Sequence, residues 1–284
     1  MSPNLRKRLA VAGVGVPLCA LVTYAGGVVF VTGLGAAAAL GYREFASMMR
    51  GTGTRVLALP GAVAAFLFPV AVFAGGLEGG GFYAAGLMLA LPALALATVS
   101  LSERPIRAAA CTTFGVFYVG GLLALGLPLR EGGLPLAATG DPGAGRMAGT
   151  LLFFLPVVIT WLADTAAYLG GRALGKRPLA PRVSPNKTVA GAVCALLAGV
   201  ATAALYPRFL LPELWALDVV PTLAFGLVVT GMAIVGDLAE SALKRECGVK
   251  DSSGLLPGHG GMLDRLDSIL WAVPAAFLFL FLFG

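Results

Sequence analysis

A chain of 284 residues in which 58% are hydrophobic and only 12% are charged cannot be an ordinary soluble domain, because such domains carry about 25% charged residues. The net charge of +6 does not indicate nucleic-acid binding either, since the basic residues lie between apolar segments rather than along one face. No polar stretch is long enough to form a separate soluble domain. The composition therefore predicts an all-α, polytopic membrane protein that folds as a helical bundle.

Apolar segments of about 20 residues, the length of a helix that crosses a bilayer, follow one another along the chain. The first comes after Arg6-Lys7-Arg8, as in a signal peptide, but the poor cleavage site and a second apolar segment directly after a Gly26-Gly27 turn favour a retained span. No segment alternates as a membrane-spanning strand does, which excludes a barrel. We predict about nine transmembrane helices, at residues 9–26, 27–47, 56–75, 81–101, 108–127, 148–169, 189–206, 219–240 and 264–283.

The lysines and arginines predict how these helices are oriented. With the N-terminus in the cytoplasm, only Arg130, Arg146 and Arg208 of the 20 basic residues fall on the outer side. We therefore expect a multi-pass protein of the cell membrane (inner or plasma membrane) with a cytoplasmic N-terminus. The charges of Tyr42-Arg43-Glu44-Phe45, at the end of the second span, are expected at the lipid headgroups.

A Gly/Pro-rich external stretch at 128–147 divides the chain into two regions. Residues 1–127 carry five spans with almost no polar chemistry and are interpreted as a scaffold. Residues 128–284 carry four spans and two cytoplasmic loops, 170–188 and 241–263, in which the polar residues gather.

Four aspartates from three different spans come at the inner boundary of the membrane: Asp164, Asp237, Asp264 and Asp267. A carboxylate at that depth costs a few kcal/mol, so it marks either a function or a buried ion pair. Asp264 and Asp267 are three positions apart, which on a helix places both on one face. Paired oxygen donors beside a basic loop suit a magnesium–phosphate site, although a solvated loop with a helix cap is the alternative.

The loop 170–188 holds five basic residues together with helix-breaking prolines and glycines. Such a loop suits a bound triphosphate. From charge alone, a loop that touches anionic lipid is the simpler interpretation.

The sequence motifs decide between these interpretations. Ser241-x-x-Lys244-Arg245, then Lys250-Asp251, then Pro257-x-His259-Gly260-Gly261-x-x-Asp264-Arg265-x-Asp267 resembles the signature of phosphatidate cytidylyltransferases, also called CDP-diacylglycerol synthases. Asp164-x-x-Ala-Tyr168-x-x-Gly and Ser184-Pro-Asn186-Lys187-Thr188 are similar to two further elements of that family. The chain departs from the family at Val189-Ala190, where Trp-Glu is usual, which leaves the role of that glutamate open.

The resemblance implies that CMP is transferred from CTP to phosphatidate, giving CDP-diacylglycerol and pyrophosphate in phospholipid biosynthesis. It implies Mg²⁺ as the cofactor, leaves open a second, monovalent cation such as K⁺, and implies a homodimer in the lipid bilayer that binds no nucleic acid. A related enzyme for another lipid phosphate and a CTP-dependent lipid kinase remain alternatives. A cation-coupled transporter is a remote one, because its acids would be expected near the midplane of the membrane and within repeats.

The same resemblance assigns the site residues. The expected metal ligands are Asp237, Asp264 and Asp267, and the other expected catalytic residues are Lys244, Arg245, Asp251, His259 and Arg265. For His259 a positioning role is favoured over metal ligation, since no histidine or cysteine partner accompanies it. The expected substrate-binding residues are Asp164, Tyr168, Ser184, Asn186, Lys187, Thr188, Ser241, Lys250, Gly260 and Gly261.

Overall fold

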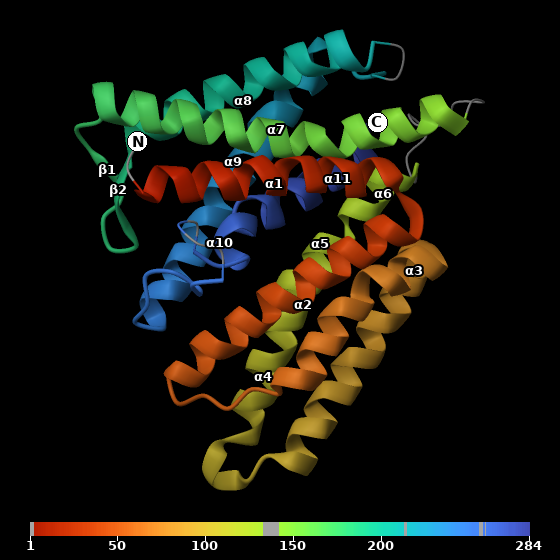
Figure 1. Cartoon of the computed structure of the whole chain (residues 1–284), viewed down its shortest axis with the longest axis vertical. Helices are drawn as coiled ribbons and strands as arrows, with labels where there is room; N and C mark the ends of the chain where they lie inside the picture. The colour runs from red at the N-terminus through yellow and green to blue at the C-terminus, as the bar shows by residue number, and fades with distance from the viewer. Residues whose placement is uncertain (1–2, 133–141, 213–214, 256–257, 259) are drawn as a thin grey trace. The chain divides into compact units, whose positions relative to one another are not determined.

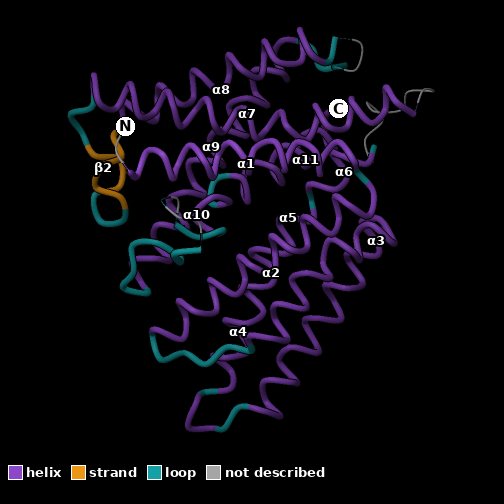
Figure 2. Tube along the Cα trace, in the orientation of Figure 1, coloured by secondary structure: helices purple, strands orange, loops and turns teal. Residues whose placement is uncertain are grey.

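The computed structural model of the chain describes residues 3–132, 142–212, 215–255, 258 and 260–284. These residues are almost entirely helical, with one short hairpin of strands (Figure 2). The elements are α1 (Pro3–Ala25), α2 (Gly27–Gly51), α3 (Ala58–Thr98), η1 (Leu101–Glu103), α4 (Pro105–Val116), η2 (Phe117–Gly121), α5 (Leu122–Ala124), α6 (Gly126–Glu131), α7 (Pro142–Leu174), β1 (Pro178–Ala180), β2 (Ser184–Thr188), α8 (Val189–Leu210), α9 (Val219–Glu246), α10 (Leu263–Leu266) and α11 (Ile269–Phe283).

Among the described residues, seven helical segments are long and apolar enough to cross a membrane. They lie at Gly27–Gly51, Ala58–Thr98, Pro105–Glu131, Gly145–Leu174, Val189–Leu210, Val219–Glu246 and Leu263–Phe283. The predicted all-α membrane bundle is therefore confirmed, while the number of nine crossings is not confirmed and stays a prediction.

Two glycine pairs explain where the first helices begin and end. Gly26 and Gly27 have φ values of 64° and 52°, which favour glycine, and they separate α1 from α2 as the sequence predicts. Gly75 and Gly76 are non-helical inside α3, and Gly76 has a φ of 62°. The break makes α3 two arms that lie side by side (Figure 1), and the Tyr83 hydroxyl of one arm donates to the Ala64 carbonyl of the other (3.0 Å).

The chain packs as two compact units, residues 1–127 with 244–266, and residues 128–243 with 267–284. In the first unit, α2, the arms of α3 and α4 pack against one another (Figure 1). Their core contains the fully buried Tyr42 and Phe45 of α2. Gly115 of α4 allows this packing, because a Cβ there would lie 2.5 Å from the Phe45 ring.

In the second unit, α7 and α8 run side by side (Figure 1), and the Tyr206 hydroxyl of α8 donates to the Leu151 carbonyl of α7 (2.9 Å). The chain between them forms the antiparallel hairpin of β1 and β2, in which Pro178 faces Thr188. Residues 170–188 were predicted to form a loop, whereas α7 continues to Leu174 and the hairpin occupies most of the rest.

The other predicted loop is also shorter than expected, since α9 continues to Glu246. We call residues 247–262 the signature loop. After it, α10 ends at Leu266 and α11 begins at Ile269. The prediction that Asp264 and Asp267 lie on one regular helix is therefore wrong. The Asp267 carboxylate accepts the backbone N–H of Ser268 (2.6 Å), and such local bonds compete with the helical pattern.

Candidate functional site

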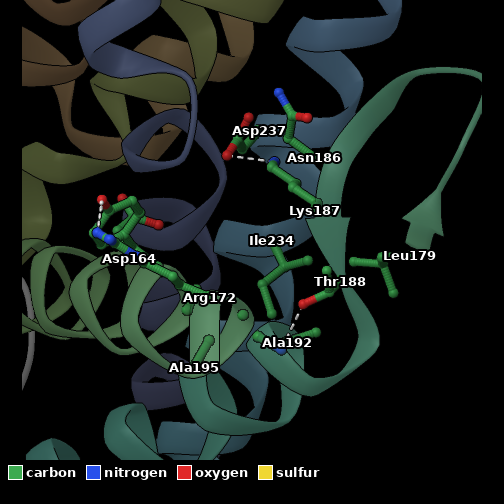
Figure 3. Close-up of a pocket in the computed structure, with 14 residues that line it drawn as sticks. Asp164, Arg172, Leu179, Asn186, Lys187, Thr188, Ala192, Ala195, Ile234 and Asp237 are labelled. Atoms are coloured by element: carbon green, nitrogen blue, oxygen red, sulfur yellow. Dashed lines mark hydrogen bonds and ion pairs between the residues drawn. The ribbon is translucent and has the colours of Figure 1, made fainter. Parts of the chain in front are cut away.

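A cavity of about 580 Å³ lies in the second unit, between α7, the hairpin, α8 and α9 (Figure 3). Residues from all four elements therefore meet around one space, although they are up to 73 positions apart in sequence (164 to 237). Six of the residues that line it are predicted site residues: Asp164, Tyr168, Asn186, Lys187, Thr188 and Asp237.

Lys187 of β2 and Asp237 of α9 form an ion pair at this cavity (Figure 3). Both side chains keep about a quarter of their surface exposed (27% and 28%), while the Lys187 Nζ atom itself is buried. The Ser241 hydroxyl, one helical turn after Asp237, donates to the same carboxylate (3.4 Å). Asp237 is thus oriented by two neighbouring polar groups.

Arg172 lines the cavity as well and was not among the predicted site residues. Its guanidinium donates to the Tyr168 hydroxyl, one turn earlier on α7 (3.4 Å). The signal in the sequence was its place in the basic stretch before the hairpin. The cavity therefore carries two cationic groups, Arg172 and Lys187, and two carboxylates, Asp164 and Asp237.

Thr188 ends the hairpin and starts α8. It is the N-cap residue, and its hydroxyl accepts the backbone N–H of Gly191 (3.1 Å). Glycines let α7 and α8 approach closely here, because a Cβ on Gly175 would lie 2.6 Å from that hydroxyl oxygen. The capping hydrogen bond forms without an acidic residue at Ala190.

In the first unit, Asp264 is buried (7% exposed) and accepts hydrogen bonds on both oxygens. One oxygen accepts the Lys244 ammonium (2.7 Å). The other accepts the Ser252 backbone N–H (2.9 Å), the Ser252 hydroxyl (2.8 Å) and the Gly261 backbone N–H (2.8 Å). Asp264 therefore links two parts of the signature loop, at Ser252 and Gly261, to the last turn of α9.

Gly260 and Gly261, two of the expected substrate-binding residues, lie against carboxylates in this structure. Gly260 has a φ of 80°, and a Cβ there would lie 2.6 Å from the Asp264 carboxylate. A Cβ on Gly261 would lie 2.1 Å from the Ser252 hydroxyl oxygen. Their contact with phosphate stays a prediction.

Glu44 contacts the signature loop, which was not predicted from the sequence. It is buried (6% exposed), and its expected position at the headgroups stays a prediction. One oxygen accepts the Ser253 hydroxyl (2.6 Å) and the Met262 N–H (2.9 Å). The other accepts the Ser252 hydroxyl (2.9 Å) and the Leu263 N–H (2.8 Å). The sequence shows only an acid between Arg43 and Phe45 at the end of an apolar span, which does not reveal these contacts.

The remaining predicted residues occupy varied positions. In the first unit, Arg245 is exposed and donates to the Val249 carbonyl (3.3 Å). Asp267, in the second unit, lies next to α9, because a Cβ on Gly236 would be 2.7 Å from the Asp267 carbonyl. Lys250, Asp251 and Arg265 are exposed and Ser184 is half-buried on β2, while His259 lies outside the described residues.

The Cys247 thiol of the signature loop is not prepared for nucleophilic attack. Burial raises the pKa of Cys247, and the neighbouring Glu246 and Cys111 raise it further. The thiol is therefore protonated at neutral pH.

The described residues contain no group of three or more histidine, cysteine or acidic side chains placed to hold a metal ion. The cavity nevertheless has the donors that Mg²⁺ prefers, since the oxygens of Asp164, Asn186 and Asp237 line it. The chemistry of this donor set fits a magnesium ion.

Comparison with known proteins gives consistent results. The sequence model of the cytidylyltransferase family matches residues 6–283. Phosphatidate cytidylyltransferase of Brucella suis is 41% identical over 204 residues, which cover 72% of this chain and 67% of the relative. Phosphatidate cytidylyltransferase 4, chloroplastic, of Arabidopsis thaliana is 31% identical over 306 residues, which cover 98% of this chain and 73% of the relative.

Proposed function

The chain belongs to the cytidylyltransferase family, and we propose on that basis that it transfers CMP from CTP to phosphatidate, forming CDP-diacylglycerol and pyrophosphate. The observation that carries the proposal is the match over residues 6–283, together with curated relatives that are named for this reaction. The cavity supports it, because it gathers cationic and carboxylate side chains in a chain that is otherwise poor in charge.

The chemistry requires positive charge around phosphates, and Lys187 and Arg172 provide it at the cavity. Lys187 would exchange its contact with Asp237 for a phosphate oxygen of CTP. The phosphate of phosphatidate, largely ionised at neutral pH, attacks the α-phosphorus of CTP. A new P–O bond forms, the bond between the α-phosphorus and the oxygen bridging to the β-phosphate breaks, and pyrophosphate leaves. No side-chain nucleophile takes part.

We propose Mg²⁺ as the cofactor. Asp237 would hold it, with Asp164 and Asn186 as further oxygen donors of the same cavity. The backbone carbonyl of Asp267 lies close to Gly236, the residue before Asp237. When bound, the ion supplies positive charge that neutralises phosphate oxygens. The metal-binding role expected for Asp264 stays a prediction from the sequence, as does a monovalent cation.

The long apolar helices make the chain a multi-pass membrane protein. We propose that the membrane is the cell membrane, that the signature loop and the hairpin face the cytoplasm, where CTP is available, and that the active form is a homodimer. The distribution of basic residues supports the orientation. The acyl chains of phosphatidate would stay among the lipids.

Cysteine labelling of sealed cells tests this orientation. Ser252 is buried, so the exposed Leu255 (51%) is the better reporter in the same loop. A Leu255→Cys variant, made without the four native cysteines, is expected to resist an impermeant maleimide added to intact cells and to react in inverted vesicles. Labelling in intact cells would refute the proposed orientation.

The enzymatic proposal is tested with the purified full-length chain, CTP and phosphatidate. CDP-diacylglycerol and pyrophosphate are expected in equal amounts, with no product in EDTA and recovery after Mg²⁺ is added in excess. ATP in place of CTP is the control for nucleotide choice. Product formation that continues in EDTA would contradict the metal proposal, and no lipid product under any condition would contradict the function.

The departure at Val189-Ala190 gives a further prediction. Ala190→Glu is expected to change the KM for CTP by less than about tenfold, because Thr188 already caps α8 without an acid at that position. An acid in the first turn of a helix is also favourable, so the melting temperature should not fall. Steady-state kinetics and thermal unfolding in detergent check both points. A larger gain in affinity would mean that this chain lacks a contact that its relatives use.

A further inference from the structure

Glu44 contacts two separate segments, residues 252–253 within the signature loop and residues 262–263 where the loop leads into α10. Ser252 and Ser253 contact it through their hydroxyls, and Met262 and Leu263 through their backbone N–H groups. We infer that Glu44 is a positioning residue, which holds the signature loop in the conformation required for CMP transfer. The kinetic part of this inference rests on the proposed function.

The Glu44 carboxylate has hydrogen-bond donors at both of its oxygens. Each carboxylate oxygen accepts one serine hydroxyl and one backbone N–H, at distances from 2.6 to 2.9 Å. All four donors are neutral groups, so none of these contacts involves a charged side chain of the signature loop. Burying a carboxylate without hydrogen-bond partners costs free energy. A carboxylate is favourable where several backbone and hydroxyl groups can donate hydrogen bonds to it at once.

Ser252 links Glu44 to Asp264. Its hydroxyl oxygen lies 2.9 Å from Glu44 and 2.8 Å from Asp264. A hydroxyl has one proton and can donate to only one carboxylate at a time. The two acids therefore share this donor, while the Ser252 backbone N–H donates to Asp264 alone. A change at Glu44 is consequently expected to reach Asp264 and, through it, Lys244.

Gly261 of the signature loop packs directly against the Glu44 carboxylate. A Cβ on Gly261 would lie 2.4 Å from a Glu44 oxygen. Glu44 and the signature loop are thus in direct contact, and α2, which carries Glu44, packs against the loop at this point. Residues 1–127 thus do more than the scaffold interpretation implies, because Glu44 of α2 contacts Ser252 of the signature loop, 208 positions later in the sequence.

Glu44→Gln is the test. Glutamine keeps the size of the side chain but turns one oxygen into an NH₂ group, which faces a hydroxyl and a backbone N–H that both donated. We expect kcat to fall by about tenfold or more, with the KM for CTP changed less than about threefold. Hydrogen–deuterium exchange should rise in peptides covering 252–263 and stay unchanged in peptides covering 27–41.

Tyr42→Phe is the matched control. Tyr42 is two positions before Glu44 on α2, and its hydroxyl contacts the Leu57 carbonyl (3.0 Å) and the Thr112 side chain rather than the signature loop. The substitution removes these hydrogen bonds. A fall in melting temperature with normal kcat and normal exchange in 252–263 is expected. Glu44→Asp, which keeps the charge, should recover part of the activity and Ser253→Ala should lose less than Glu44→Gln.

Two outcomes would overturn the inference. One is unchanged exchange of 252–263 in Glu44→Gln. The other is loss of kcat to the same extent in Glu44→Gln and Tyr42→Phe, which would indicate a general effect of α2 stability. If the unmodified protein shows no CMP transfer, the proposed function fails, and the exchange experiment still decides whether Glu44 positions the loop.

Discussion

Asp237→Asn is expected to lower CMP transfer by at least about a hundredfold. Asparagine keeps the shape of the side chain but removes the charge that pairs with Lys187 at the cavity. It also removes the carboxylate proposed to hold Mg²⁺. Without that negative charge, the Lys187 ammonium loses the ion pair that holds it against α9. The proposed metal also loses a charged oxygen ligand. The measurement is kcat and kcat/KM at equal amounts of monodisperse protein.

Asp218→Asn is the control for this prediction. Asp218 is an exposed aspartate just before the other end of α9, far in sequence from the cavity-lining residues of that helix. Its replacement should leave transfer unchanged. An Asp237→Asn variant that keeps more than half of the normal kcat would contradict the role given to Asp237.

Asp264→Asn is expected to reduce transfer to a similar extent, for a different reason. The Lys244 and Asp264 side chains are mostly buried (13% and 5% exposed), and breaking a buried ion pair costs about 3–5 kcal/mol. If the asparagine oxygen faces Ser252 and Gly261, its NH₂ group faces the Lys244 ammonium. In the reverse orientation, the NH₂ group faces two backbone N–H donors. Either orientation leaves donors opposed to donors.

Glu103→Gln provides the comparison for a surface ion pair in the same unit. Arg55 and Glu103 pair with 49% and 41% of their side chains exposed, and such pairs contribute little to stability. The variant should unfold and react as the unmodified protein does. Thermal unfolding, kcat and exchange of peptides 247–263 are measured for both variants. Normal exchange and activity in Asp264→Asn would contradict the function of Asp264 as an anchor of the signature loop.

The membrane architecture could be predicted from sequence because it depends on local composition. Runs of about 20 apolar residues become helices in any bilayer. The helix break at Gly26-Gly27 was predictable for the same reason, since glycine tolerates positive φ. The predicted spans 56–75 and 81–101 correspond to the two arms of α3, which meet at Gly75 and Gly76.

The cavity could be predicted only in part. The motifs around Asp164 and Ser184, together with Asp237 at the inner end of its span, identified six of its residues. The short hairpin has no apolar alternation and was expected to be a loop. Helix ends were also missed, because charged residues such as Lys244 and Arg245 continue α9 beyond its apolar part.

Glu44 shows what sequence patterns cannot supply. Its role depends on contacts with Ser252 and Leu263, more than 200 positions away (separations of 208 and 219). A single charge at the end of an apolar span is equally typical of a headgroup contact. Only the packing of α2 against the signature loop distinguishes the two interpretations.

The fate of labelled phosphate tests the central claim most directly. Purified protein is given phosphatidate and CTP that carries radioactive phosphorus either at the α-phosphate or at the γ-phosphate. CMP transfer predicts that the α-label appears in the lipid product and the γ-label in pyrophosphate. Appearance of the γ-label in the lipid would indicate a CTP-dependent lipid kinase instead and would contradict the account.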